Sequence, residues 1–214
     1  EASGIMNLFR LSKPSYYFYQ SQRDFNDPFG KPMIHIANEW KKDSPLDVRI
    51  FSNCEEVELF LNGKSVGKQK PNQDKISKNL KHPPFTFKLP KYNPGKLEAK
   101  GFIKNINVVN HIVNSPVKPS KIKIELDVSG KKIDVNNDDI VFVYASILDK
   151  NETVLTNAND KVEFKLKGNA EIIGDNPVKT EAGVASILIK TNTKTKDLKI
   201  TVQTKKYNFS NSLT

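Results

Sequence analysis

The sequence predicts a mainly β protein in which two consecutive antiparallel β-sandwiches follow a short N-terminal helix. Three observations support this prediction. From Met33 onward, apolar residues recur at every second position, which is the period of a half-buried strand. These runs are short, and turn residues rather than helices separate them, which favours antiparallel over parallel sheets. The segment 114–120 has two prolines in seven residues and divides the β pattern into two sets.

The composition of the 214 residues is that of a folded, basic chain. Hydrophobic residues make up 37% and charged residues 27%, so a packed core is expected and wholesale disorder is not. No apolar run reaches the ~18 residues that a membrane span needs, and none is predicted. The single cysteine, Cys54, excludes an internal disulfide. The chain starts at Glu1 without a signal-peptide pattern, which indicates a mature chain or a fragment.

The net charge of +10 raises the hypothesis of an acidic partner. Only three of the 34 basic residues are arginine, the residue that best reads base edges. Lysines alternate along expected strands, as at Lys121 and Lys123 or at Lys165 and Lys167, which is typical of the solvated face of a sheet. We therefore favour solvated surface over a patch for nucleic acid or anionic glycan, and expect no nucleic-acid partner.

Residues 4–23 are the only stretch for which a helix is predicted. Pro14 suits a first helical position, and the turn-rich segment 24–28 ends the stretch. The aromatic residues at 16–19 are consecutive and point all round a helix, so burial on every side is expected. Core packing is favoured over an aromatic ladder that stacks sugars or bases. The predicted organisation is a helix and linker at 1–28, a first sandwich at 29–115 and a second at 116–214.

Alternating apolar residues predict the strands of the first sandwich. They are Ile34 and Ile36; Leu46, Val48 and Ile50; Val57, Leu59 and Leu61; Phe85, Phe87 and Leu89; Leu97, Ala99 and Ile103; and Ile106, Val108 and Ile112. Asn62 and Gly63 stand between the third run and a return strand at 64–68. Asn-Gly between two extended runs is the strongest short signal for a type I′ hairpin turn, because both positions need a positive φ.

The second sandwich is predicted in the same way. Its alternating residues are Ile122, Ile124, Leu126 and Val128; Val162, Phe164 and Leu166; Ala185, Ile187 and Ile189; and Leu198, Ile200 and Val202. The nearly continuous apolar run from Ile140 to Leu148 predicts a central strand buried on both faces. No close sequence repeat relates the two sets, so their similarity is one of architecture.

No catalytic constellation is found, and no catalytic residue is assigned. The densest acidic cluster is Glu55, Glu56 and Glu58. On a strand, Glu56 and Glu58 share the face opposite the apolar residues, where the raised pKa of a general acid is not expected. The three histidines lie in unrelated β segments. No nucleotide, dinucleotide or metalloprotease motif occurs, and no cofactor is expected.

Two pairs of residues are candidates for binding. Asp149 and Asn151 have the spacing that opens a calcium loop, but the glycine and glutamate that complete such a loop are missing, so turn chemistry is favoured. Trp40 and Tyr92 are candidate carbohydrate contacts, because an exposed aromatic ring can stack on a sugar. Burial in the core or at a domain interface is the favoured alternative for Trp40.

Two stretches together resemble one enzyme family. They are SGIMNLFRLSKPSYYFYQSQR at 3–23 and SNCEEVELFLNGKSVG at 52–67. Both are similar to the region that follows the catalytic barrel in bacterial glycoside hydrolase family 2 enzymes of the β-galactosidase type. HPPFTF at 82–87 and Pro94-Gly95 also fit the sandwich of that region, and 118–214 resembles the bacterial Ig-like domain of the invasin type that often ends such chains. Asn7 stands where the family often has aspartate, and Ser12-Lys13-Pro14 replaces the more usual Pro-Lys order.

The resemblance implies a non-catalytic, C-terminal accessory β region of a retaining exo-glycosidase that acts in carbohydrate degradation. β-Galactosidase is the commonest activity it implies, with glucuronide or mannoside as other substrates. The catalytic glutamates of the family lie in the barrel, so none is carried over and this chain alone is expected to be inactive. The implied partner is the upstream barrel of the same polypeptide, with glycan as a further candidate, in the bacterial periplasm or outside the cell. The alternatives are an autonomous carbohydrate-binding module and an adhesin-like pair of Ig domains.

Under this resemblance, residues 1–28 are the end of the barrel, and the helix lacks a partner on one face. We expect the helix to pack on the first sandwich, with at least one of the aromatic residues Tyr16, Tyr17, Phe18 and Tyr19 in solvent or at a contact with another molecule. Self-association through the helix is a further expectation. Deletion of residues 1–24 is then expected to leave both sandwiches folded and to reduce that self-association.

Overall fold

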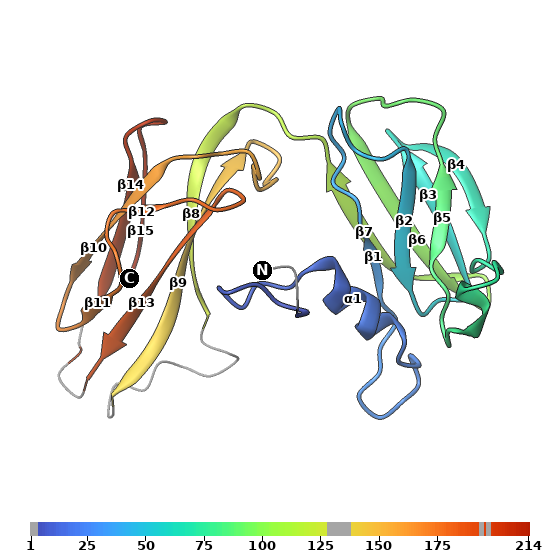
Figure 1. Cartoon of the computed structure of the whole chain (residues 1–214), viewed down its shortest axis with the longest axis horizontal. Coiled ribbons are helices and arrows are strands. Elements are labelled where there is room, and N and C mark those ends of the chain that lie inside the picture. The colour runs from blue at the N-terminus through green and yellow to red at the C-terminus, as the bar shows by residue number, and fades with distance from the viewer. Residues whose placement is uncertain (1–3, 128–137, 193–194, 196–197) are drawn as a thin grey trace. The chain divides into compact units, whose positions relative to one another are not determined.

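The computed structural model describes residues 4–127, 138–192, 195 and 198–214, and the chain divides into two compact units (Figure 1). The first unit is Glu1–Ser115 and the second is Pro116–Thr214, so the boundary falls where the proline-containing segment begins. Residues 1–28 are part of the first unit. The described residues are mainly β, with a single α-helix that is too short to cross a membrane.

Helix α1 spans Pro14–Ser21, with Pro14 in its first turn as predicted. The prediction of a helix was wrong for residues 4–13. There, the side-chain oxygen of Asn7 accepts hydrogen bonds from the backbone N–H groups of Phe9, at 3.0 Å, and Leu11, at 2.9 Å. An asparagine that bonds its own neighbourhood in this way offers the backbone an alternative to the helical pattern.

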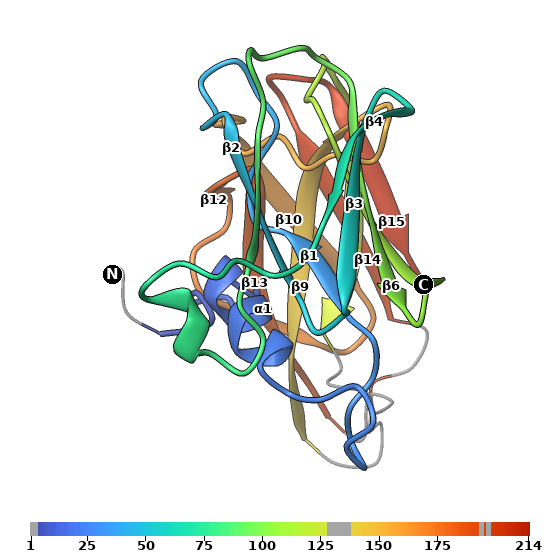
Figure 2. The same ribbon diagram turned by 90° about the vertical axis from the view of Figure 1, so that its right-hand side faces the viewer.

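The first unit has a three-stranded sheet in the order β1-β2-β5 and a four-stranded sheet in the order β4-β3-β6-β7, both antiparallel (Figure 2). The strands are β1 (Ile34–Ile36), β2 (Asp47–Ser52), β3 (Glu56–Leu61), β4 (Lys64–Gln69), β5 (Phe85–Lys88), β6 (Lys96–Ile103) and β7 (Ile106–Asn114), with a 3-10 turn η1 (Ser77–Asn79) before β5. Alternate residues of the two sheets face each other and form one core. Its buried members are Ile34, Ile36, Trp40, Val48, Ile50, Val57, Leu59, Phe85, Phe87, Leu89, Leu97 and Ala99.

Strand β7 turns a different face to the core from the one expected. Ile106, Val108 and Ile112 are 66%, 41% and 47% exposed, whereas Val109 and Val113 pack against the core. The pairing of β7 with β6 contains a register shift. A shift of this kind adds one residue to a strand and exchanges its two faces, so a pattern of period two cannot locate it.

The predicted type I′ turn is confirmed. Asn62 has a φ of 52° and Gly63 a φ of 79°, and the flanking residues Leu61 and Lys64 pair across the hairpin. The side chain of Asn62 also reaches the turn before β6, where it accepts the N–H of Lys96 at 2.8 Å and donates to the carbonyl of Pro94 at 3.0 Å. Asn62 therefore holds two turns of the same sheet.

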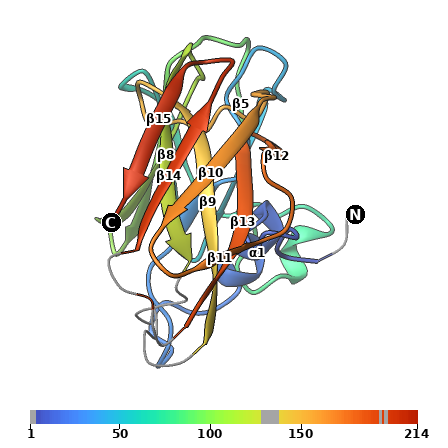
Figure 3. The ribbon, with the colours of Figure 1, turned by 90° about the vertical axis from the view of Figure 1, so that its left-hand side faces the viewer.

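The second unit has two four-stranded antiparallel sheets, in the orders β12-β10-β14-β15 and β11-β13-β9-β8 (Figure 3). The strands are β8 (Pro119–Asp127), β9 (Asp139–Asp149), β10 (Lys161–Lys167), β11 (Glu171–Ile173), β12 (Val178–Lys179), β13 (Val184–Thr191), β14 (Lys199–Thr204) and β15 (Phe209–Leu213). The core is formed by Ile122, Ile124, Val141, Val143, Ala145, Val162, Phe164, Ala185, Ile187, Ile189, Ile200 and Val202.

Strand β9 is the central strand that the apolar run predicted. It lies between β13 and β8, and every residue from Val143 to Asp149 is buried. The solvent-accessible residues of this strand lie near its start, where Ile140 is 58% exposed. Val128, which was expected to continue the first strand of this unit, lies outside the described residues.

Candidate functional site

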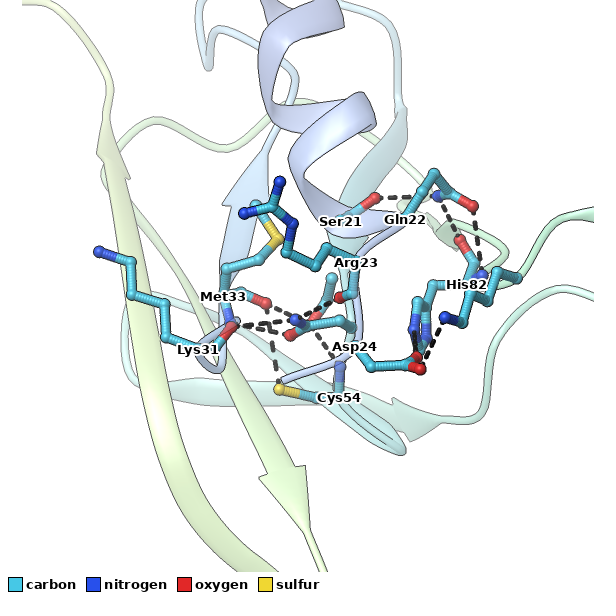
Figure 4. Close-up of polar contacts among 11 residues, drawn as sticks. Ser21, Gln22, Arg23, Asp24, Lys31, Met33, Cys54 and His82 are labelled. Carbon is cyan, nitrogen blue, oxygen red and sulfur yellow. Dashed lines mark hydrogen bonds and ion pairs between the residues drawn. The ribbon is translucent and has the colours of Figure 1, made fainter. Parts of the chain in front are cut away.

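Four segments of the first unit meet in a set of polar contacts at the C-terminal end of α1 (Figure 4). They are residues 21–24 at the end of the helix, 31–33 before β1, 52–54 at the end of β2, and 81–82 before β5. We call these segments the helix joint. They connect the N-terminal part of the unit to three separate places on its sandwich, and thus fix where the helix lies.

The centre of the helix joint is Asn53, whose side chain is nearly completely buried at 3% exposure. Its amide nitrogen donates to the carbonyl oxygens of Arg23, at 2.9 Å, and Lys31, at 3.0 Å. Its amide oxygen accepts the N–H of Met33 at 2.9 Å. A buried amide is unfavourable unless it is hydrogen-bonded. Here the Asn53 side chain makes its hydrogen bonds to both ends of the linker between α1 and β1, residues 23 and 31–33.

The neighbours of Asn53 complete this half of the joint. The Ser52 hydroxyl donates to the carbonyl of Met33 at 2.7 Å and accepts the N–H of Cys54 at 3.1 Å. Burial raises the pKa of the Cys54 thiol, so this cysteine is a protonated packing residue with little nucleophilic character. A Cβ added at Gly101 would lie 2.6 Å from the sulfur of Cys54, which explains why glycine stands beside it.

The other half of the joint binds the end of α1 to the segment before β5. The side-chain amide of Gln22 donates to the carbonyl of His82 at 2.8 Å and accepts the N–H of the same residue at 3.2 Å. The Asp24 carboxylate lies 2.6 Å from the Lys81 ammonium and 2.7 Å from Nε2 of His82. Hydrogen bonds from Lys81 and then His82 lower the pKa of Asp24, so the carboxylate is ionised at neutral pH.

Aromatic rings support the helix from the side. Tyr17 stacks on His35 with ring centres 3.6 Å apart, and His35 lies 4.6 Å from His111. Phe18 meets Phe51 of β2 edge to face at 5.4 Å. Burial, followed by the nearby His111, lowers the pKa of His35 to about 4, and burial lowers the pKa of His111 as well. Both imidazoles are therefore neutral at pH 7, and Nδ1 of His111 accepts the N–H of Ile36 at 3.2 Å.

The expectation that α1 packs on the first sandwich is confirmed by these ring contacts. Burial of the aromatic residues on every side was wrong, because Tyr19 is 65% exposed. Tyr16, Tyr17 and Phe18 are half-buried. The prediction that at least one of the four rings lies in solvent is thereby confirmed.

Of the two predicted carbohydrate contacts, Trp40 is a core residue. Its ring is fully buried, and its indole N–H donates to the carbonyl of Asn93 at 2.9 Å. A ring without an exposed face cannot stack on a sugar, so the sugar contact was wrong for Trp40 and the alternative of core burial holds. Tyr92 is half-buried, lies 5.1 Å from Trp40 and donates its hydroxyl to Ser115 at 3.1 Å. A sugar contact at Tyr92 stays a prediction.

The calcium candidates form a turn. The Asp149 carboxylate is buried, and its two oxygens accept N–H groups from Val117 at 3.0 Å, Asn151 at 2.8 Å and Thr153 at 3.0 Å. Burial raises the pKa of Asp149, but these backbone donors together outweigh it and hold the pKa below its usual value. The arrangement supports turn chemistry over calcium. In the described ranges, no group of three or more His, Cys, Asp and Glu residues is placed to hold a metal ion.

The acidic cluster on β3 also lies where the sequence predicted, on the outer face. The Glu56 carboxylate is 2.6 Å from the Lys68 ammonium, and Glu58 accepts the Ser65 hydroxyl at 2.7 Å. The hydrogen bond from Lys68 lowers the pKa of Glu56. A general acid needs the opposite shift.

Sequence reasoning did not single out Asn53, Gln22, Asp24 or His82, although they form the joint. Their partners are mostly backbone groups that lie tens of residues away, and no motif marks such contacts. The one local signal is a polar residue, Asn53, directly after a buried strand.

Two family models match the chain. Residues 43–110 match "Domain of unknown function (DUF4982)" and residues 124–211 match "Glycoside hydrolase family 2 C-terminal domain 5". The chain is 31% identical over 202 residues to a β-galactosidase of Thermoanaerobacter pseudethanolicus, covering 89% of this chain and 27% of that protein. It is 29% identical over 186 residues to β-galactosidase BoGH2A of Bacteroides ovatus, covering 83% of this chain and 20% of that protein. The chain thus spans about a quarter or less of the length of these relatives.

Solved structures show the same fold. A β-glycosidase from Bacteroides vulgatus superposes with a TM-score of 0.79 at 24% identity, over 98% of this chain and 27% of that one. A glycosyl hydrolase family 2 member from Bacteroides cellulosilyticus superposes with a TM-score of 0.76 at 23% identity, over 100% of this chain and 32% of that one.

Proposed function

This chain corresponds to the C-terminal region of glycoside hydrolase family 2 enzymes, and we propose that it is the non-catalytic accessory part of a larger exo-glycosidase of the β-galactosidase type. Relatives named β-galactosidase support a β-galactoside as the substrate of the whole protein, and relatives named β-glucuronidase support the β-glucuronide alternative equally. The relatives are several times longer than this chain, which supports a catalytic domain elsewhere in the polypeptide.

The helix joint is the observation that carries this proposal. It fixes a short helix on the first sandwich through a buried amide, Asn53, and a charged group, Asp24. A rigid link of this kind is what an accessory region needs if it is to support a preceding domain in one orientation. The large apolar side chains exposed within residues 5–29 are Ile5 at 42%, Met6 at 40%, Leu8 at 84%, Tyr19 at 65% and Phe29 at 88%. In our proposal they contact the catalytic barrel of the same polypeptide.

The carboxylates that cleave the glycosidic bond would come from that barrel. We assay the purified chain, residues 1–214, with aryl β-galactoside, β-glucuronide and β-mannoside, and expect no turnover above the blank. Turnover that is abolished by replacing an acidic residue of this chain would overturn the accessory role. The proposed location of the whole enzyme is the periplasm or the cell exterior, and fractionation of the native host is its test.

Self-association through α1 belongs to the same proposal, because an apolar face that normally meets the barrel is open in the chain alone. Tyr19→Ser removes the most exposed ring of the helix and is expected to shift the sedimentation profile toward monomer. Ile140→Ser, which removes an apolar side chain of similar exposure (58%) from the second unit, is the matched control. Equal profiles for the parent chain and Tyr19→Ser would exclude the helix as the contact.

A further inference from the structure

The outer face of the sheet β12-β10-β14-β15 carries a concentration of exposed lysines, and this sheet lies toward the viewer in Figure 3. The alternating residues Val162, Phe164, Ile200 and Val202 point into the core, so their strand neighbours point outward. The outward lysines are Lys161, Lys165 and Lys167 of β10, Lys179 of β12, Lys199 of β14 and Lys205 directly after it. We call these six residues the lysine face.

Among the described strand residues, the lysine face holds one outward carboxylate, Glu163. Lys165 alone forms an ion pair, with Glu163 at 3.7 Å, and the other five pair with no carboxylate among the described residues. On the other sheet of this unit, Lys123 pairs with Glu125 at 2.6 Å and Lys190 with Asp138 at 3.2 Å. The positive charge of this one face is therefore available to a partner.

The register of the sheet places like charges against each other. Lys161 pairs directly with Lys179, and Lys167 directly with Lys199. Like charges that lie opposite on neighbouring strands repel and destabilise a sheet. A face that only has to stay solvated can alternate charges of opposite sign. Two like-charged lysine pairs, neither with an ion pair to a described carboxylate, therefore favour a surface shaped by an anionic partner.

The same face contains a hollow and neutral hydrogen-bonding groups. The hollow has a volume of ≈ 270 Å³ and is lined by Lys161, Glu163, Pro177, Gln203 and Lys205. Next to it, Gln203 is paired across strands with Ser210, and Thr201 with Ser212. The side-chain amide N–H of Gln203 already donates to Glu163, so it is the hydroxyl groups of Thr201, Ser210 and Ser212 beside the lysines that suit a ligand carrying both hydroxyl and anionic groups.

We propose that the lysine face binds an anionic polysaccharide, a sugar chain bearing carboxylate or sulfate groups. The outward strand residues of this sheet include no aromatic side chain on which bases could stack, and all three arginines of the chain lie in the first unit. Charge alone would also suit nucleic acid, so the choice of a polysaccharide rests on the proposed function as part of a glycosidase. Bound in this way, the second unit would hold the enzyme on an acidic glycan.

The test measures binding of the 214-residue chain to polygalacturonate and to heparin, with neutral galactan and duplex DNA as comparisons. We expect both acidic chains to bind, with affinity that falls as salt rises, and galactan not to bind. The variant Lys161→Gln/Lys199→Gln/Lys205→Gln should bind at least tenfold more weakly and depend less on salt. The control Lys68→Gln/Lys96→Gln/Lys123→Gln removes the same charge from ion-paired lysines and should stay within twofold of the parent.

Equal losses in the two variants would overturn the proposal, because net charge alone would then explain binding. No binding at low salt, or equal binding of galactan, would overturn it as well. Tighter binding of DNA than of both polysaccharides would reassign the face to nucleic acid. Thermal unfolding of each variant shows that a loss of binding is not a loss of fold. Failure here leaves the accessory role standing, since that role is judged by the hydrolysis assay, which the lysine variants do not affect.

Discussion

One outer sheet face of the first sandwich and one of the second differ in how their lysines are paired. On the outer face of β4-β3-β6-β7, Lys68 pairs with Glu56 at 2.6 Å and Lys96 with Glu98 at 2.9 Å. Lys68 also lies over the ring of Phe102, with 4.3 Å to its centre. On the lysine face of the second unit, five of the six ammonium groups have neither an ion pair nor a ring contact with a described residue. The net charge of +10 is therefore spread unevenly. On the first face glutamates neutralise Lys68 and Lys96, whereas most ammonium groups of the lysine face have no such partner among the described residues.

The two units also differ in the polar groups that they bury. The first unit holds all three histidines of the chain and the buried amide of Asn53. The second unit has no histidine, and Asp149, its buried carboxylate, ties a turn within its own sandwich. The first unit is thus built to hold an additional segment, and its stability should depend on that contact and on pH in ways that the second unit does not share.

The largest effect is expected for Asn53→Ala. It leaves two carbonyl oxygens and one N–H of the linker without their partner, and each buried unsatisfied group costs ~1–3 kcal/mol, so we expect the first unit to lose about 3 kcal/mol of unfolding free energy. Hydrogen exchange followed separately in the two units measures this, and the second unit should not change. Asn38→Ala is the matched control, because Asn38 also bonds two backbone groups of this unit but is half-buried. Equal losses would contradict the central role of the joint.

The pH dependence should also separate the units. His35 has a folded pKa of about 4 against an ordinary value of 6.5, so between these values the unfolded chain binds a proton that the folded chain does not. Stability of the first unit should therefore fall as pH drops from 6.5 to 4, by about 3 kcal/mol in total. His111 shifts in the same direction, and Tyr17 is the other ring in contact.

His35→Phe keeps a ring against Tyr17 and removes this titration. Urea unfolding of the parent chain and of the variant at pH 7, 6 and 5 makes the comparison. The parent should lose stability over this interval, and the variant should lose clearly less. A second unit that destabilises as steeply as the first would contradict the assignment, because it has no histidine to titrate there.

A smaller effect is expected for Gly30→Ala. A Cβ at this position would lie 2.0 Å from the carbonyl oxygen of Asp24, so the linker must move and draw Asp24 away from its partners. Overpacking of this kind costs ~1–3 kcal/mol, and we expect about 2 kcal/mol in the unfolding free energy of the first unit. Asn26→Ala, at an exposed position of the same loop, is the control and should be neutral. A neutral Gly30→Ala would show that the loop tolerates displacement and adds nothing to the joint.

Local patterns predicted the strands and the two sandwiches because apolar alternation and turn residues act over a few positions. The central strand β9 and the Asn62-Gly63 turn are the clearest cases. Patterns of this range failed for β7, where a register shift exchanged the two faces. They also failed for residues 4–13, where the Asn7 side chain accepts the backbone N–H groups of Phe9 and Leu11.

The candidate site was much less predictable than the fold. Asn53 reaches Arg23 and Lys31, which lie 30 and 22 residues away, and its partners are backbone atoms that any residue supplies. The lysine face was also only partly predictable from the sequence. Lys165 and Lys167 alternate visibly in the sequence, but only the sheet register shows which lysines oppose each other and which lack a carboxylate.

The smallest change in unfolding free energy is expected for a substitution in one of two similar hairpin turns, Asn62-Gly63 and Ala182-Gly183. Ala182 and Gly183 of the second unit have φ of 47° and 79°, nearly the values of Asn62 and Gly63. The surroundings differ, because a Cβ at Gly63 would meet nothing within 4 Å, whereas one at Gly183 would lie 2.3 Å from the carbonyl oxygen of Leu155. Gly63→Val should therefore show only the strain of a β-branched residue at positive φ, ~1 kcal/mol or somewhat more.

Gly183→Val should cost more than Gly63→Val, because it adds a backbone clash to the same strain. Chemical denaturation of both variants, read separately in each unit, gives the two values. If Gly63→Val left the unfolding free energy unchanged, the turn would not require a positive φ at that position. Equal costs at the two glycines would show that the backbone at Leu155 shifts to accommodate the added carbon. If the costs rank as expected, the turn geometry that the two sandwiches share accounts for the smaller value, and the packing that differs between them accounts for the remainder.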